Sequence, residues 1–486
     1  MKFYSKVNRS ICYFFIAVFA ILLFNCKKHN DPEVVDVRDS AYYYSLIYYL
    51  WNQNLPDYTK WSSSKNGDLI LNSSTIFKPH NFELVDSVME APNGIRKYSE
   101  VTSNGKNADR YSFAIHQIDW EKVSTGSNLG YGFRRKYISD SDLRIVYVFS
   151  SSPMGLAGVK RGWRIITVNG ISASTANDAS IQNSLGSNTT STFVFQLPDN
   201  SQKSIPITKA AYKADFVLSN NIITVNTQKI GYISFYSFLG DNSGQTTIDT
   251  LTKIITKFNS AGVTDIVVDL RYNGGGYVSV SEGFANLLAP STAKGKAMYS
   301  TKYNQIYTDY LNSKNIALTT NFNTSNALLN LSRIVFITSE ETASASELLI
   351  NNLKPYMTVK LVGTTTYGKP VGFPGILIQM SKTDKTQNYY VFPISFQTVN
   401  ANKEGGYFYG INVDNTQNDD VTHDFGDPNE GNLKEAIAYL TTGSFVRIGN
   451  SSSTKKSFNF NSSQEDIGGF NGMIQNNRSD INKLPK

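Results

Sequence analysis

The chain has 486 residues, of which 40% are apolar and 17% charged, a composition that can bury a substantial core and excludes a wholly disordered chain. Lys and Arg number 46 against 39 Asp and Glu, and the excess forms no basic block, so nucleic-acid binding has no electrostatic support. Two cysteines without a CxxC pair and four histidines without an HExxH motif exclude a disulfide scaffold and a structural zinc site, and we expect no metal and no other cofactor.

Residues 1–25 have the form of an export signal, with a short basic start and an almost unbroken apolar run from Ile11 to Phe24. The run has fourteen residues, fewer than the roughly 20 that a membrane-spanning helix needs. Leu23 to Cys26 resembles a bacterial lipobox, although Asn25 stands where a small residue is usual. The resemblance implies a protein of the cell envelope, anchored to the membrane by lipid on Cys26, on the periplasmic or outer-surface side. The alternative, a short N-terminal membrane anchor, also places the bulk of the chain outside the cytoplasm.

The length is enough for roughly three domains, and composition and periodicity indicate their limits. Residues 26–120 combine a polar tether with an apolar stretch of helical spacing at 40–54, and are predicted to be a small helical N-terminal domain. Residues 121–212 alternate short apolar strands with Gly-rich turns and are predicted to be a β domain. Residues 446–486 are rich in Ser, Asn and Gly and are predicted to be a flexible tail.

Residues 213–445 are predicted to form the largest domain, in which strands and helices alternate. A strand, an amphipathic helix and a second buried strand form a βαβ unit with parallel strands and a right-handed crossover. Two such units follow each other, so we expect an α/β (α+β) multidomain protein. The strands are expected at 229–238, 264–270, 333–338 and 358–363, and the helices at 248–258 and 344–354.

Gly363 to Lys369 matches the first seven positions of a phosphate-binding P-loop. The eighth position, where a Ser or Thr hydroxyl would bind magnesium, is Pro370. Gly372 and Pro374 then prevent the helix that such a loop opens. We therefore reject a nucleotide site at this segment.

Ser344 stands where an apolar strand turns into a helix. Its hydroxyl would lie at a helix N-terminus, where backbone N–H groups without helical acceptors can stabilise an oxyanion. The pattern Ser344-x-x-Glu347 is also a capping box, which many helices have without any catalytic role. A hydroxyl nucleophile needs a base, and none of the four histidines stands in a recognisable triad. A lysine whose pKa is lowered by burial can serve instead.

Three motifs follow each other along the chain: Asp269-Leu270-Arg271-Tyr272-Asn273-Gly274-Gly275-Gly276, Thr342-Ala343-Ser344-Ala345-Ser346-Glu347 and Gly363-Thr364-Thr365-Thr366-Tyr367-Gly368-Lys369. They resemble those of the S41 peptidases, the C-terminal processing or tail-specific proteases. Ser344 and Lys369 stand 25 residues apart, as the nucleophile and the base do in that family. The similarity extends between residues 100 and 440, and includes Asp109 to Phe113 and the segment from Gly410 to Asp414.

The resemblance implies a serine-type peptidase with a Ser/Lys dyad. Ser344 would attack the peptide carbonyl, and neutral Lys369 would take its proton and later pass it to the leaving amine. The backbone N–H groups of Gly275 and Ala345 would form the oxyanion hole. Such a dyad requires a dry, apolar pocket that keeps the lysine largely unprotonated.

One position departs from the family pattern. Many members have Gln four residues after the lysine, where it orients the base, and Phe373 stands there in this chain. Either Glu347 takes the orienting role, or the pair acts as a bare dyad and Glu347 serves as a helix cap alone.

The β segment at 121–212 resembles a PDZ domain, because a Gly-x-Gly-Phe loop is followed by a segment, Ser152 to Ile166, that corresponds to the helix, turn and strand of that fold. In such a domain the loop N–H groups bind a terminal carboxylate, and an extended peptide adds a strand to the sheet edge. The partners implied are proteins or peptides with accessible C-termini. The loop residues are Gly130, Tyr131, Gly132 and Phe133.

We therefore predict an exported serine endopeptidase that binds C-terminal tails through its PDZ domain and hydrolyses peptide bonds with the dyad. One alternative is a catalytically inactive peptide- or ligand-binding lipoprotein on the same fold, which Phe373 leaves open. A second alternative is a surface protein that binds glycan or a protein partner through its Asn-, Ser- and Tyr-rich surface.

Overall fold

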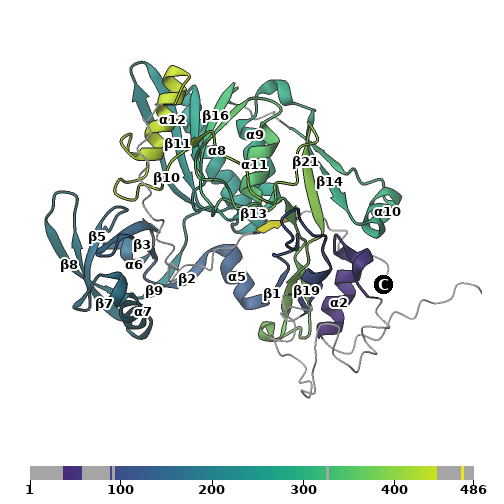
Figure 1. The fold of residues 1–486 in the computed structure, drawn as a ribbon, viewed down its shortest axis with the longest axis horizontal. Helices are drawn as coiled ribbons and strands as arrows, with labels where there is room; N and C mark the ends of the chain where they lie inside the picture. The colour runs from purple at the N-terminus through teal and green to yellow at the C-terminus, as the bar shows by residue number, and fades with distance from the viewer. Residues whose placement is uncertain (1–36, 57–87, 90–93, 324–327, 446–471, 476–486) are drawn as a thin grey trace, which may run out of the picture.

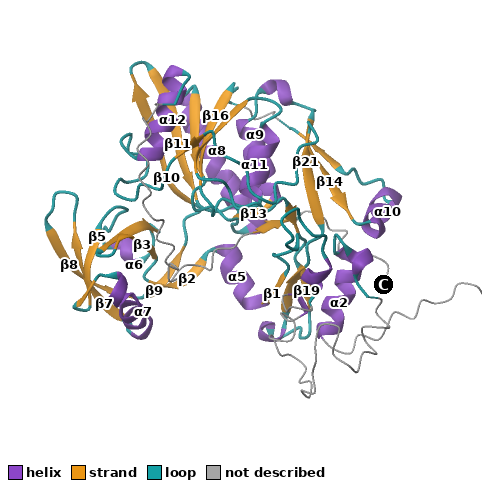
Figure 2. Cartoon of the chain, in the orientation of Figure 1, coloured by secondary structure: helices purple, strands orange, loops and turns teal. Residues whose placement is uncertain are grey.

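The structure is a computed structural model that describes residues 37–56, 88–89, 94–323, 328–445 and 472–475. The predicted export signal and Cys26 lie outside the described residues, so the lipid anchor stays a prediction. Within the described ranges, no helix is both long enough and apolar enough to cross a membrane. Helices and strands are mixed along the chain, as Figure 2 shows, and the predicted α/β class is confirmed.

A sheet of six strands forms the centre of the largest domain (Figure 1). β10 and β11 are antiparallel, and every later pair in the sheet is parallel. The predicted βαβ units are therefore present, and the predicted strands at 333–338 and 358–363 have the observed bounds. In sheet order the strands are β10 (Val217–Val225), β11 (Gln228–Phe235), β12 (Asp265–Asp269), β16 (Arg333–Thr338), β17 (Thr358–Gly363) and β22 (Asn415–Thr416).

Both faces of this sheet are covered, as expected for parallel strands that are apolar throughout. Successive side chains point to opposite faces, so Val267 packs against α12 (Gly431–Thr442) while Val268 faces the other helices. The helices on the second face are α8 (Gln245–Ser260), α9 (Val278–Leu288) and α11 (Ala345–Leu353). α11 begins directly after the loop that follows β16, which places its N-terminus at the carboxyl edge of the sheet.

Two smaller sheets flank the core, and the first of them lies against α11 (Figure 1). Their strands come from distant parts of the chain, so the described N-terminal residues pair with residues far along the sequence. The first sheet consists of β15 (Thr319–Asn321), β14 (Ala297–Tyr303), β21 (Phe396–Asn400) and β18 (Val371–Gly372), and the second of β1 (Phe113–His116), β20 (Tyr389–Phe392) and β19 (Ile376–Ile378).

The described N-terminal residues do not form the separate domain predicted for 26–120. Tyr48 of α2 (Val37–Tyr48) stacks edge-on against Tyr307 of α10 (Gln305–Ser313), with ring centroids 5.3 Å apart. The N–H of Leu50 donates to the carbonyl of Ile394 over 2.7 Å. These residues belong to one hydrophobic cluster with the helices of the sheet. The aromatic stretch at 40–54 therefore forms part of the hydrophobic core of the large domain.

The β domain has a core of its own, as the sequence predicts for 121–212. It follows α5 (Gln117–Thr125) and is joined to the rest of the chain by a ribbon of β2 (Ser127–Gly130) and β9 (Ala210–Lys213). Its sheet has β3 at one edge, and the helices α6 (Pro153–Leu156) and α7 (Asp178–Ser187) lie in the same domain. The strands are β3 (Phe133–Ser139), β4 (Asp142–Val148), β5 (Arg164–Val168), β7 (Thr190–Gln196) and β8 (Gln202–Thr208), with β6 (Ile171–Ser172) beside β5.

One part of the predicted flexible tail is a buried strand. β23 (Gly472–Ile474) pairs in parallel with β13 (Gly275–Tyr277), and appears as the short yellow arrow beside β13 in Figure 1. The prediction for 446–486 is wrong for these residues, because main-chain pairing with a neighbouring strand holds a segment whatever its polar composition.

Candidate functional site

Ser344 lies in a strained turn between β16 and α11. Its φ of 60° is a conformation that residues other than glycine adopt at a cost, and such strain persists where the surroundings impose it. The side chain is completely buried, and its Oγ has no hydrogen-bond partner among the described residues. A buried hydroxyl with no partner is uncommon in proteins, so this oxygen is available for a ligand group.

Glu347 lies on the first turn of α11 and is completely buried. Ser344 and Glu347 are the N-cap and N3 residues of the capping box that the sequence predicts. The carboxylate accepts the N–H of Ser344 over 2.8 Å, and the serine Oγ faces the N3 backbone without a hydrogen bond of standard geometry. The same carboxylate accepts the hydroxyl of Thr366 over 2.5 Å and the backbone N–H groups of Gly368 and Lys369 over 2.8 Å each. Glu347 therefore joins the serine turn to the lysine loop.

Lys369 lies in a pocket of aromatic side chains. Its Nζ is 4.3 Å from the ring centroid of Phe373 and 4.6 Å from that of Tyr111. Burial lowers the pKa of Lys369 from 10.5 to about 7, with Arg96 acting in the same direction and with Asp109 and Glu347 opposing. The dry pocket that the dyad requires is present, and Phe373 is part of its wall.

Burial also raises the pKa of Glu347, and the hydrogen bonds from Thr366 and the backbone act in the opposite direction. Its contacts are to the backbone at Ser344 and Lys369, so it holds both segments at their main chain.

The glycine loop brings Gly275 next to the N-terminus of α11. A Cβ at Gly275 would lie 3.1 Å from the backbone N of Ala345, so the two predicted oxyanion donors lie side by side. The φ of Gly275 is 110°, which a side chain would not tolerate. Its N–H donates to Oδ1 of Asn273 over 2.9 Å, so this amide is held in place by a bond that a substrate oxygen would have to share or replace.

The sequence reasoning named no role for Asn273, Thr366 or Tyr111. Tyr111 donates its hydroxyl to the carbonyl of Gly368 over 2.9 Å and so fixes the lysine loop from a point 257 residues earlier. The Asp109 carboxylate holds the turn that leads into Tyr111, because it accepts the N–H groups of Tyr111 and Ser112 over 2.9 Å each. The similarity of Asp109 to Phe113 to the family was the signal that could have revealed these two residues.

The predicted carboxylate loop of the β domain has its residues at the base of edge strand β3. The Tyr131 side chain points inward, and its hydroxyl bonds with the Ser191 hydroxyl at 2.7 Å. Gly132 is required here, because a Cβ would lie 2.0 Å from that of Ser152. Arg134, which directly follows the loop residues, forms a bidentate ion pair with Glu341, three residues before Ser344.

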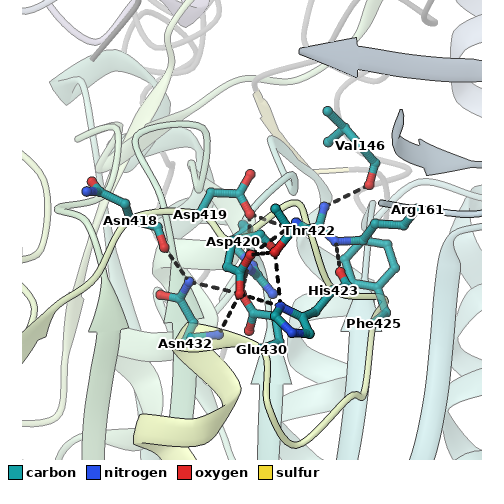
Figure 3. A network of polar contacts seen from close by, with 12 residues as sticks. Val146, Arg161, Asn418, Asp419, Asp420, Thr422, His423, Phe425, Glu430 and Asn432 are labelled. Atoms are coloured by element: carbon teal, nitrogen blue, oxygen red, sulfur yellow. Dashed lines mark hydrogen bonds and ion pairs between the residues drawn. The ribbon is translucent and has the colours of Figure 1, made fainter. Parts of the chain in front are cut away.

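A polar network joins the β domain to the core around Arg161, as Figure 3 shows. The buried guanidinium of Arg161 donates to Asp419 at 2.8 Å, to the Tyr272 hydroxyl at 2.8 Å and to the carbonyl of Val146 at 2.7 Å. Asp419 is also paired with Arg271. Burial alone would raise the pKa of Asp419, but the two guanidinium groups outweigh it and hold the pKa below its ordinary value. The Asp-Leu-Arg-Tyr motif is thus a structural junction.

The described residues contain no group of three or more His, Cys, Asp or Glu side chains that could hold a metal ion. His423, which the sequence places in an acidic loop, bonds with Asp420 at 2.7 Å and stays partly exposed. The site therefore consists of a buried serine at a helix N-terminus, a buried lysine and a carboxylate that joins their backbones, at the carboxyl edge of the parallel strands.

Residues 229–387 match the model of Peptidase family S41. The chain is 26% identical over 179 residues to a probable CtpA-like serine protease of Staphylococcus aureus (strain COL), a match that covers 36% of this chain. The match spans 33% of the length of this curated relative. The putative S41 protease of Bacteroides fragilis NCTC 9343 has the same fold, with a TM-score of 0.61 and 23% identity over 84% of this chain and 97% of that one.

Proposed function

We propose that the protein is a serine peptidase in which Ser344 is the nucleophile and Lys369 the general base. The observation that carries the proposal is that Glu347 binds the backbones of both a buried serine whose hydroxyl has no hydrogen bond and a buried lysine whose pKa burial lowers to about 7. At neutral pH a large share of such a lysine is uncharged and can accept a proton. The family match at 229–387 supports the same reaction class.

In the proposed reaction, the Ser344 Oγ attacks the peptide carbonyl carbon while its proton passes to the Lys369 Nζ. The carbonyl oxygen becomes an oxyanion, stabilised by N–H groups of Ala345 and the glycine loop at Gly275. Collapse of this intermediate breaks the C–N bond, and the lysine returns the proton to the leaving amine. Water, activated by the neutral lysine, then hydrolyses the acyl-serine and restores both groups.

Glu347 is a positioning residue in this scheme. It touches neither the substrate nor the transferred proton, and acts by fixing the backbones of Ser344 and Lys369. Phe373 takes the place of the usual Gln and contributes the apolar wall that lowers the lysine pKa.

The β domain is proposed to act as a PDZ domain that binds the C-terminal tails of protein or peptide substrates. Its strand β3 is at a sheet edge, where an extended peptide can add a strand. Arg134 belongs to this strand, and its ion pair with Glu341 connects the strand to the turn before Ser344. The lipid anchor at Cys26 and a position in the cell envelope belong to the same proposal and rest on the sequence.

The test is cleavage of an unfolded protein with an apolar C-terminus by residues 27–486. Wild type should degrade it, whereas Ser344→Ala and Lys369→Arg should not, because the first lacks the nucleophile and a guanidinium does not give up its proton. Equal cleavage by wild type and Ser344→Ala would reject the proposal. If no substrate is cleaved by wild type, a peptide-binding protein on the same fold becomes the better interpretation.

A further inference from the structure

The described conformation buries both the proposed nucleophile and the proposed base. Ser344 and Lys369 are 0% and 1% exposed, so a peptide cannot reach the serine until some segment moves. Gly472 lies against the glycine loop near Ala345. A Cβ at Gly275 would lie 2.4 Å from the Gly472 carbonyl oxygen. The chain's own C-terminal segment therefore lies at the predicted oxyanion site.

This segment is bound through its main chain on both sides. On one side, the N–H of Gly472 donates to the carbonyl of Gly274 over 3.0 Å, next to Gly275. On the other side, the N–H of Phe373 donates to the carbonyl of Met473 over 2.9 Å, and the N–H of Gln475 donates to the carbonyl of Phe373 over 3.2 Å. The two neighbours of the strand are thus the oxyanion loop and the wall of the lysine pocket.

The same two walls leave room for a strand because each has a glycine where the strand comes closest. A Cβ at Gly372 would lie 2.7 Å from the carbonyl oxygen of Met473, as one at Gly275 would collide with Gly472. Met473 and Ile474 are completely buried, and the Tyr303 hydroxyl donates to Oε1 of Gln475 over 2.8 Å. A slot that offers main-chain hydrogen bonds along both sides and apolar surroundings for side chains can accept an extended peptide of varied sequence, because the main chain supplies most of the contacts.

We propose that Gly472–Gln475 occupies the position that the scissile segment of a peptide substrate takes, and that the C-terminal segment is an internal competitor for the site. The inference rests on the proposed function and identifies the substrate strand within it. In this assignment the Gly472 carbonyl takes the position of the substrate carbonyl that is attacked. Met473 and Ile474 take the positions of the two residues that follow the cleaved bond. The site would therefore favour a small residue before the bond and apolar residues after it.

The test measures binding, with no need for cleavage. In residues 27–486 carrying Ser344→Ala, Met473→Asp together with Ile474→Asp should expel the strand, since two buried carboxylates are costly. The probe is a fluorescein-labelled peptide with the sequence of residues 469–476, followed by fluorescence anisotropy. The double variant should bind it at least about tenfold more tightly than its parent, a difference of about 1.4 kcal/mol. The matched control, Asn476→Asp together with Asn477→Asp, should bind like the parent.

A second variant covers the case in which the double substitution unfolds the protein. Tyr277 and Ile474 are register partners, and both natural cysteines precede residue 27, so Tyr277→Cys with Ile474→Cys provides the sole thiols. Oxidation should lock the strand in place and abolish probe binding, and reduction should restore it.

Equal probe binding by parent and double variant, or by the oxidised and reduced forms, would overturn the inference and make β23 a permanent part of the fold. A failure of the peptidase proposal is seen separately, as wild type that cleaves no protein although the released site still binds the probe. Competitive inhibition of wild-type cleavage by the same peptide would support both proposals.

Discussion

Ser344 and Lys369 donate their backbone N–H groups to one and the same oxygen, Oε2 of Glu347, over 2.8 Å each. The serine turn and the lysine loop come from different strands of the sheet, β16 and β17. A single buried carboxylate oxygen thus fixes the position of the proposed nucleophile relative to the proposed base.

Replacing Glu347 by Gln should reduce kcat by roughly 100-fold, because an amide presents one acceptor where the carboxylate presents two, and small displacements of a nucleophile have costs of this size. Removal of the negative neighbour should also lower the pKa of Lys369, so the midpoint of the pH–rate profile should move to lower pH. Glu435→Gln, at a buried glutamate of α12, is the matched control and should change neither quantity. An unchanged pH midpoint with lower kcat would show that Glu347 acts only as a helix cap.

The rate of peptide hydrolysis should rise with pH, with a midpoint at about 7, because the active form of Lys369 is the neutral one. At pH 6 the value of kcat/KM should be about one tenth of its plateau, and above pH 8 it should change little. Single-turnover assays over this range will measure it. A rate that falls from pH 6 to pH 8 would contradict the assignment of the base.

The buried lysine should lower the free energy of unfolding at neutral pH relative to an apolar residue at the same position. Its pKa is about 7 in the folded protein and 10.5 when exposed, so between these values the unfolded chain binds the extra proton and stability rises with pH. Lys369→Met should remove this slope and raise the free energy of unfolding at pH 7 by a few kcal/mol. Urea unfolding at pH 7 and pH 9.5 will compare the two proteins. Equal slopes for both would show that Lys369 is charged in the fold.

Much of the large domain could be predicted from the sequence because its strands are buried on both faces and therefore appear as continuous apolar runs. Ser344 and Lys369 were predicted from family motifs, and apolar surroundings of the lysine were expected because a Ser/Lys dyad requires them. Tyr111 could not be linked to Gly368, since the contact joins loops 257 residues apart. β23 could not be predicted either, because main-chain hydrogen bonds hold it and its flanking sequence is polar.

Hydrolysis should be insensitive to chelators, because a lysine base requires no metal and the described residues contain no cluster of ligands for one. Incubation with EDTA should leave the rate of protein cleavage unchanged within the error of the assay. Loss of activity that added Zn²⁺ or Mg²⁺ restores would contradict the dyad scheme.

Arg161 should hold the β domain to the core. Its side chain is buried and donates to Asp419, to the Tyr272 hydroxyl and to the carbonyls of Val146, Asp420 and His423, so Arg161→Met leaves Asp419 with a weaker counter-charge and breaks five hydrogen bonds. Removal of one partner from a buried ion pair costs about 3–5 kcal/mol, and here Arg271 still compensates part of the charge, so we expect the lower end of that range. The neighbouring exposed Lys160→Met is the matched control and should be neutral. Calorimetry should show the β domain of Arg161→Met melting before the core, whereas one shared transition in both variants would show that other contacts, such as the pair of Arg134 and Glu341, carry the junction.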